Sequence, residues 1–337
     1  MPVIPALSRP PAAPAAPPDE SARHYRDSLC RALGPAVLEA LADPDVTEIY
    51  VNPSGHLYFD TRSQGRVAAP APTRLSSEQI LRFLNLVGSR IPTVLNAGRP
   101  QIQAELPADG FLGARLQGFV PPLAAAPSFN LRKPPTVVYT LDDYAHAGIL
   151  SPRHREALAD AVRRRRNILV AGGTASGKTT LVNAVLHEIT TTFPRDRIVV
   201  LEDTVELHCA APDHLALRTT DSIRLRDLVK AALRTSPDRI VVGEVRDEAA
   251  LDLLDAWETG HPGGCATLHA NDALGALNRL DRLAQRANAG PQPHLVGDAI
   301  HLVVMIAGGS QRRRVTELAL VHGFDGSGYR LTPIPAT

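Results

Sequence analysis

The stretch GGTASGKT, residues 172–179, decides the fold class of this 337-residue chain. It follows the apolar run NILVA (167–171) and precedes TTLVNAVLHEI (179–189), which has the spacing of a helix. A strand, a turn of the form GxxxxGKT and a helix are the parts of a phosphate-binding loop. Glycines let backbone N–H groups converge on phosphate oxygens, and the start of the helix adds a favourable dipole. The stretch therefore predicts a nucleotide-binding α/β domain.

The residue types of this loop predict ATP and Mg²⁺ as cofactors. Lys178 is expected to reach the β- and γ-phosphates, and the Thr179 hydroxyl is expected to bind Mg²⁺. The nucleotide-binding residues expected from the loop are Gly172, Gly173, Thr174, Ala175, Ser176, Gly177, Lys178, Thr179 and Thr180.

Strand-like and helix-like segments alternate across the second part of the chain, residues 151–330. Apolar runs at 196–203, 238–246 and 265–270 alternate with helical patterns such as 225–236 and 248–260. This alternation predicts a mostly parallel sheet with helices on both faces.

The first part of the chain has a different pattern and predicts a smaller α+β domain over residues 21–133. Val46 to Asp60 has the alternation of a hairpin, and residues 76–91 have helical periodicity with Leu81, Leu84 and Val87 on one face. Residues 1–20 are rich in Pro and Ala and predict a disordered tail, and residues 134–150 predict a linker.

The bulk composition is typical of a soluble globular protein. The net charge of +1 creates no overall field that would attract nucleic acid or acidic lipid. Three cysteines without a CxxC pair disfavour a zinc site and a disulfide framework, and predict reduced thiols in a cytosolic chain. The apolar run at 299–309 is too short to span a bilayer, so membrane association is expected to be peripheral.

Acidic residues end two of the predicted strands. Glu202 and Asp203 follow RIVVL (197–201), and Glu244 follows RIVVG (239–243). The carboxyl ends of parallel strands line the ligand crevice, so these acids are expected to face the nucleotide. Glu244 is expected to hold Mg²⁺ through water. Glu202 is expected to position the attacking water, with Glu206 as an alternative; solvated acids at strand ends, or capping roles, are the competing interpretation.

Two further stretches bear on the chemistry. His269 ends the segment GHPGGCATLH (260–269) and predicts a sensor of the γ-phosphate, against the alternative of a satisfied core histidine. The run Arg163–Arg166 is interpreted as a solvated helix terminus. A nucleic-acid patch is the weaker alternative, because no aromatic residues interleave with the arginines.

Three segments together resemble a known family. LEDTVELH (201–208), LRTSPDRIVVGEVRDEAALDLL (233–254) and WETGHPGGCATLHAND (257–272) are similar to the Asp box, Walker B region and His box of the secretion and traffic ATPase superfamily. Within its type IV secretion branch the chain resembles TrbB-type conjugal transfer ATPases, and DVTEIYVNPSG (45–55) fits that branch. The resemblance covers roughly residues 25–320, and four motifs fall in the family's order.

This resemblance implies a fold and an assembly. It implies a PAS-like N-terminal domain before a RecA-like ATPase domain, and a homo-hexamer at the cytoplasmic face of the inner membrane. The implied function is ATP hydrolysis that powers conjugal DNA transfer or type IV secretion. The partners would be inner-membrane components of that system, without direct nucleic-acid binding. It also implies that Arg115 and Arg132 reach the nucleotide phosphates, with Arg234 and Arg246 in similar roles.

Some residues depart from the family pattern. Ala175 stands where relatives often have glycine, which costs about 1 kcal/mol if the backbone there is left-handed. Ser236 stands where the family's LRxRPD has its second arginine. Cysteine pairs seen in type II secretion ATPases are absent, which disfavours that branch. The alternatives left open are a tight-adherence or type IV pilus ATPase, a nucleotide-binding docking switch with little hydrolysis, and a DNA-translocating ring motor.

Overall fold

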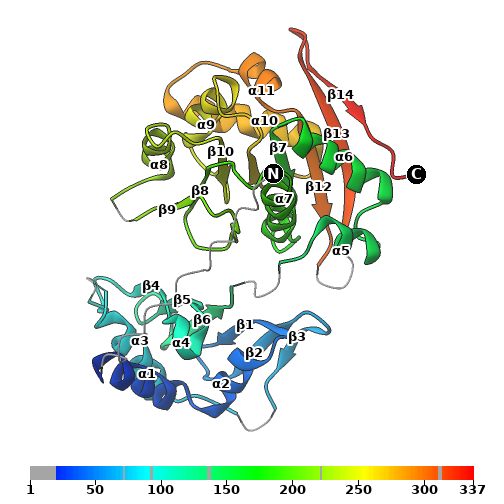
Figure 1. Cartoon of the computed structure of the whole chain (residues 1–337). Helices are drawn as coiled ribbons and strands as arrows, with labels where there is room; N and C mark the ends of the chain where they lie inside the picture. The colour runs from blue at the N-terminus through cyan, green and yellow to red at the C-terminus, as the bar shows by residue number, and fades with distance from the viewer. Residues whose placement is uncertain (1–19, 71–72, 92–93, 135–137, 221, 310–312) are drawn as a thin grey trace, which may run out of the picture. The chain divides into compact units, whose positions relative to one another are not determined.

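The computed structural model describes residues 20–70, 73–91, 94–134, 138–220, 222–309 and 313–337. The chain divides into two compact units, residues 1–133 and residues 134–337 (Figure 1). The predicted disordered tail, apart from residue 20, lies outside the described residues.

An antiparallel sheet organises the described part of unit 1, with strands in the order β3-β2-β1-β6-β5-β4. The predicted hairpin is present, because Tyr50 pairs with Tyr58 across its two strands. The strands are β1 (Val46–Val51), β2 (Leu57–Thr61), β3 (Gly65–Ala68), β4 (Gln101–Glu105), β5 (Arg115–Phe119) and β6 (Ser128–Arg132).

One face of this sheet carries the core of unit 1. Alternate residues such as Ile49, Leu116 and Leu131 are fully buried there with Phe83 and Leu29. Polar residues occupy the intervening positions, which is the pattern of an antiparallel sheet with one solvated face. The helices of the unit are α1 (Glu20–Leu33), α2 (Pro35–Ala42), α3 (Ser77–Gly88) and α4 (Ala108–Phe111).

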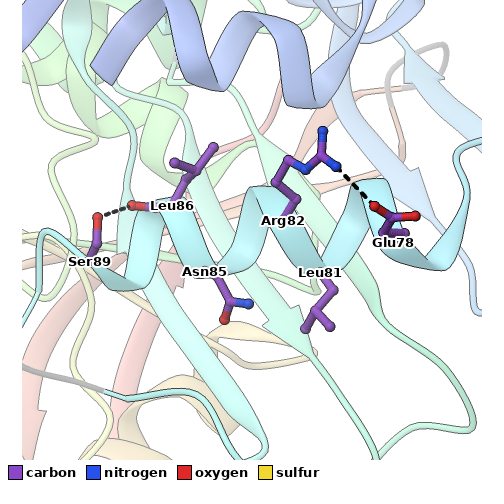
Figure 2. A pocket seen from close by; sticks show the side chains of 6 residues that line it. All are labelled: Glu78, Leu81, Arg82, Asn85, Leu86 and Ser89. Atoms are coloured by element: carbon purple, nitrogen blue, oxygen red, sulfur yellow. Dashed lines mark hydrogen bonds and ion pairs between the residues drawn. The ribbon is translucent and has the colours of Figure 1, made fainter. Parts of the chain in front are cut away.

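Helix α3 begins at a capping box, in which Ser76 and Gln79 each bond the other's backbone N–H. The predicted buried face of α3, with Leu81, Leu84 and Val87, is confirmed for two of these three residues. Leu84 and Val87 are buried but Leu81 is 39% exposed, because Ile80 and Phe83 point to the core instead. A hollow on the outer side of α3 is shown in Figure 2 and contains none of the predicted site residues. It is lined by Glu78, Leu81, Arg82, Asn85, Leu86 and Ser89.

A mostly parallel sheet organises unit 2, as the alternating sequence pattern predicts. Its order is β14-β13-β12-β7-β11-β10-β8-β9, and every neighbouring pair from β12 to β9 is parallel. β13 and β14 extend one edge antiparallel. The strands are β7 (Ile168–Ala171), β8 (Ile198–Glu202), β9 (His214–Arg218), β10 (Arg239–Val242), β11 (Cys265–Leu268), β12 (Leu302–Ala307), β13 (Arg314–Phe324) and β14 (Tyr329–Pro333).

Helices cover both faces of this sheet, so its central strands are apolar throughout (Figure 1). In β7, Leu169 belongs to the core under α8–α11, whereas Val170 belongs to the core under α5–α7. The helices are α5 (Leu141–His146), α6 (Pro152–Arg163), α7 (Lys178–Thr192), α8 (Leu225–Ala232), α9 (Ala249–Glu258), α10 (Ala273–Ala284) and α11 (Pro293–Ala299), with a 3₁₀ turn η1 (Gln285–Ala287).

The edges of unit 2 differ from the predicted bounds of the domain. The segment interpreted as a linker, residues 134–150, includes α5, whose Leu141 and Tyr144 are buried in the core of unit 2. At the other end, β14 continues past residue 330 to Pro333. Helix α5 contributes apolar side chains and β14 contributes strand pairing to unit 2, so both segments belong to it.

The arginine run 163–166 is largely bound to carboxylates of its own unit. Arg164 Nε lies 2.8 Å from Asp160, and Arg165 donates to Asp196 over 2.7 Å. Asp196 also accepts from Arg239, which is fully buried. These ion pairs leave the run without a continuous patch of unpaired charge.

Candidate nucleotide-binding and catalytic site

The phosphate loop lies between β7 and α7, as predicted. Gly177 has φ +94° and directly precedes Lys178, the first residue of α7. Ala175 has φ +56°, so the departure from glycine falls on a left-handed backbone position. A non-glycine residue there carries conformational strain of about 1–2 kcal/mol.

The backbone of β12 and the side chain of Arg313 lie close to the two ends of the loop. A Cβ at Gly172 would lie 2.1 Å from the carbonyl oxygen of Ile306 in β12. A Cβ at Gly177 would lie 2.5 Å from Nε of Arg313, the residue before β13. Close approach of the β12 backbone therefore requires glycine at 172, whereas at 177 the left-handed φ of +94° favours glycine.

Lys178 is almost fully buried, and loop carbonyls hold its ammonium group. Nζ donates to the Gly173 oxygen over 2.9 Å and to the Gly172 oxygen over 3.3 Å. The Ser176 hydroxyl donates to the same Gly173 oxygen over 2.9 Å. The loop thus carries its lysine at the centre of the turn that would cradle phosphate.

His269 joins Lys178 to Glu244. Nζ of Lys178 lies 3.3 Å from Nδ1 of His269, and Oε1 of Glu244 lies 3.2 Å from Nε2. An ammonium only donates and a carboxylate only accepts, so the arrangement fits a neutral ring with its proton on Nε2. Burial, and then the charge of Lys178, lower the pKa of His269 below its ordinary value, which favours that neutral form.

Glu244 lies two residues after the end of β10, and both of its carboxylate oxygens have partners. Oε2 accepts from Arg246 over 2.6 Å, while Oε1 faces His269. Burial raises the pKa of Glu244, but Arg246, His269 and Lys178 together outweigh burial, and the pKa falls below the ordinary value. The carboxylate is therefore ionised at neutral pH beside the lysine of the phosphate loop.

Arg246 continues this network to the next strand. Its NH1 lies 3.4 Å from Oδ2 of Asp203, which follows β8. The sequence suggested Arg246 as a phosphate-contacting residue, whereas in this structure its guanidinium bridges two carboxylates. The network runs Lys178, His269, Glu244, Arg246 and Asp203.

Glu202 has a structural use that the sequence did not reveal. Its side chain is 5% exposed, and Oε1 accepts from the backbone N–H groups of Glu206 and Leu207, each over 2.9 Å. The carboxylate therefore shapes the loop after β8. Glu206 contributes its backbone oxygen to Asn183 of α7, which ties the same loop to the helix of the phosphate site.

The donor set fits a magnesium ion that arrives with a nucleotide. Thr179 follows Lys178 in the first turn of α7, and Glu244 is ionised nearby. Over the described ranges, no group of three or more His, Cys, Asp or Glu side chains is placed to hold a metal. Mg²⁺ needs no such cage, because phosphate oxygens and water supply most of its ligands in nucleotide sites.

The two arginines predicted in unit 1 are neighbours. Arg115 in β5 pairs directly with Arg132 in β6, on the polar face of the sheet. Glu105 flanks Arg115 across β4, and Glu48 flanks Arg132 across β1, with Oε1 3.7 Å from Arg132 Nε. The row across the four strands therefore reads Glu48, Arg132, Arg115 and Glu105, with the two arginines adjacent and a carboxylate residue on each side.

Two features escaped the sequence analysis: the link from Arg246 to Asp203, and Arg313 beside Gly177. Arg313 stands in a basic run, RRR at 312–314, that gave no signal of its own because the strand after it, β13, was not predicted. Within the described residues, no helix is both long and apolar enough to cross a membrane.

Comparison with known proteins gives the family. The chain is 42% identical over 303 residues to a probable conjugal transfer protein TrbB of Sinorhizobium fredii, covering 90% of this chain and 91% of that protein. It is 40% identical to the conjugal transfer protein TrbB of Rhizobium radiobacter, with 91% and 92% covered.

Solved structures share the fold. The ATPase DotB of Yersinia pseudotuberculosis matches with a TM-score of 0.62 at 19% identity, over 94% of this chain and 83% of that chain. The pilus retraction motor PilT matches with a TM-score of 0.59 at 18% identity, over 88% and 80%. The model of the family described as "Type II/IV secretion system protein" matches residues 31–308, and the chain therefore belongs to that family.

Proposed function

We propose that this protein hydrolyses ATP with Mg²⁺ and that hydrolysis powers conjugal DNA transfer through a type IV secretion system. The observation that carries the proposal is the contact of the phosphate-loop Lys178 with His269 and, through it, with Glu244. The two relatives at 40–42% identity are named conjugal transfer proteins, which favours conjugation over a pilus machine.

The residues of unit 2 receive the following roles. Backbone N–H groups of residues 173–179 bind the phosphates, and Lys178 turns from the loop carbonyls to the β- and γ-phosphates. Thr179 would hold Mg²⁺ directly and Glu244 would hold it through water, and a bound ion would neutralise charge on the phosphates. When Lys178 turns to the phosphates, Nδ1 of His269 loses the ammonium group that now lies beside it. His269 is then available to sense the γ-phosphate.

Glu244 is also the best candidate to orient the attacking water. It is ionised, partly exposed and joined to the lysine network. Glu202 is buried, with one carboxylate oxygen already accepting two backbone N–H groups. We therefore assign Glu202 to holding the loop after β8, in place of the water-orienting role expected from the sequence.

We further propose a PAS-like identity for unit 1, a RecA-like identity for unit 2, and a homo-hexamer at the cytoplasmic face of the inner membrane. Arg115 and Arg132 would stabilise the charge on the transferring phosphate, because arginine forks match phosphate geometry. Their direct pairing across β5 and β6 supports a joint role.

The test is the steady-state ATPase rate measured against protein concentration. We expect a specific rate that rises with concentration, as ring assembly completes the sites, and that vanishes in Lys178→Ala. Lys230→Ala, at an exposed position on α8, is the matched control and should keep the wild-type rate. A rate that survives Lys178→Ala would refute the proposed site. Nucleotide binding without lysine-dependent turnover, in the presence of membrane partners, would favour a docking switch.

A further inference from the structure

Arg313 places a guanidinium group directly against the phosphate loop. If Gly177 carried a Cβ, that atom would lie 2.5 Å from Nε and 2.7 Å from Cζ of Arg313. Gly177 is the residue that turns the loop into α7 and immediately precedes Lys178. The guanidinium therefore lies beside the part of the loop where backbone donors converge.

This guanidinium lacks a protein partner on its buried side. Nε of Arg313 is inaccessible to solvent and has no hydrogen-bond acceptor, and among the described residues no carboxylate forms an ion pair with it. A buried N–H group without a partner costs free energy. Other arginines of unit 2 behave differently, since Arg246 and Arg165 both bind carboxylates.

The backbone around Arg313 is fixed to the sheet. Arg314 pairs with Ala307 of β12, and the N–H of Val315 donates to the Ile149 oxygen over 2.8 Å. β12 itself pairs in parallel with β7, the strand that leads into the loop. Arg313 is therefore presented to the loop from a rigid edge, which reduces the conformational entropy lost when it binds a ligand.

We infer that Arg313 binds the phosphate chain of the nucleotide from within the ATPase unit, adding a second cation beside Lys178. The inference rests on the proposed nucleotide-binding function of the loop. A phosphate oxygen would supply the acceptor that Nε lacks, and the planar guanidinium fork binds phosphate with well-defined geometry. Gly177 adjoins Lys178, which is expected to reach the β-phosphate. ADP and ATP share that phosphate, so the contact is expected with both nucleotides.

The experiment measures the affinity of the full chain for MgADP and for pyrophosphate by calorimetry. Arg313→Gln should weaken both ligands by the same factor, about 10- to 100-fold, since a hydrogen bond to a charged group is lost. Arg314→Gln is the matched control, because Arg314 is the exposed next residue, and it should bind both ligands as the wild type does. Arg313→Lys keeps the charge without the fork and should recover part of the loss.

A second readout separates binding from a structural role. Thermal unfolding without ligand should be unchanged in Arg313→Gln, whereas the rise in melting temperature caused by MgADP should shrink. Three results for Arg313→Gln would overturn the inference. The first is an affinity for both ligands within twofold of the wild type, and the second is a weaker affinity for MgADP with an unchanged affinity for pyrophosphate. The third is a marked fall in melting temperature in the absence of ligand. Failure of the wild type itself to bind MgADP would instead refute the proposed function of the loop. If Arg313→Gln does not fold, Arg313→Lys provides the test. An affinity of Arg313→Lys for MgADP and pyrophosphate equal to that of the wild type would show that the guanidinium fork is not needed, which overturns the inference.

Discussion

Nζ of Lys178 lies 3.3 Å from Nδ1 of His269, so the lysine of the phosphate loop and the histidine after β11 share one electrostatic environment. Neither residue is near the other in sequence, and strand pairing of β7 with β11 brings them together. A change of charge at Lys178 should therefore change the pKa of the His269 imidazole.

The pKa of His269 should respond in opposite directions to two substitutions. Lys178→Ala should raise it, because a positive charge that disfavours imidazolium is removed. Glu244→Gln should lower it, because a carboxylate that favours imidazolium is removed. A histidine NMR titration, with His269→Gln to assign the signal, measures both. Shifts of the same sign would contradict the network.

The same histidine should make stability depend on pH. Its pKa in the folded protein is below the ordinary value of about 6.5, so the unfolded chain binds more protons in acid. The contribution is fully present above about pH 6.5 and is lost as pH falls through the lowered folded value. Urea unfolding between pH 5 and 7.5 should show a weaker pH dependence in His269→Gln than in the wild type; identical slopes would exclude the contribution.

Substitutions of Glu202 should lower the stability of the protein, whereas substitution of Glu244 should lower its catalytic rate. Glu202→Ala removes the acceptor of two backbone N–H groups and should lower the free energy of unfolding by about 1–3 kcal/mol, whereas Glu202→Gln keeps an acceptor oxygen and should lower it less. Glu244→Gln should retain the fold and lose most ATP hydrolysis. Denaturant unfolding and turnover are measured on all three variants. Full turnover in Glu244→Gln would return the water-orienting role to Glu202.

Arg115→Gln and Arg132→Gln should each lower kcat about tenfold or more, because arginines that stabilise a transferring phosphoryl group have large effects. The double variant should lose less than the product of the single losses, since the paired residues share one site. Arg82→Gln, on the exposed side of α3, is the control from the same unit. Multiplicative losses would indicate independent roles.

Asp196 should support unit 2 without taking part in its chemistry. It binds Arg165 and the fully buried Arg239, both over 2.7 Å. Asp196→Ala leaves a buried guanidinium without its carboxylate and should lower the free energy of unfolding by about 3–5 kcal/mol. Asp160→Ala breaks only exposed pairs and should cost less than about 1 kcal/mol. Equal effects in chemical unfolding would contradict a buried ion pair.

Local sequence was sufficient for the phosphate loop and for the four central parallel strands, β7, β8, β10 and β11. A GxxxxGKT turn between an apolar run and a helix is typical of a phosphate-binding loop. A strand that is buried on both faces must be apolar at every position, as residues 168–171 are. The sequence marked Ala175 as a departure from glycine but left its backbone conformation open, and the structure gives it φ +56°. The edge strands β9, β13 and β14 were missed, because exposed residues interrupt their apolar pattern.

Tertiary structure decided how the carboxylates and arginines are used. Glu202 and Glu244 end adjacent parallel strands and are indistinguishable by position in the sequence, yet one side chain points into backbone N–H groups and the other toward His269. Arg313 lies 135 residues beyond Lys178 and meets the loop only because β12 pairs with β7. Residue type and spacing determined that the chain could hold a nucleotide. Long-range strand pairing determined which charges surround it, because Coulomb interactions depend on distance in space and not on distance along the chain.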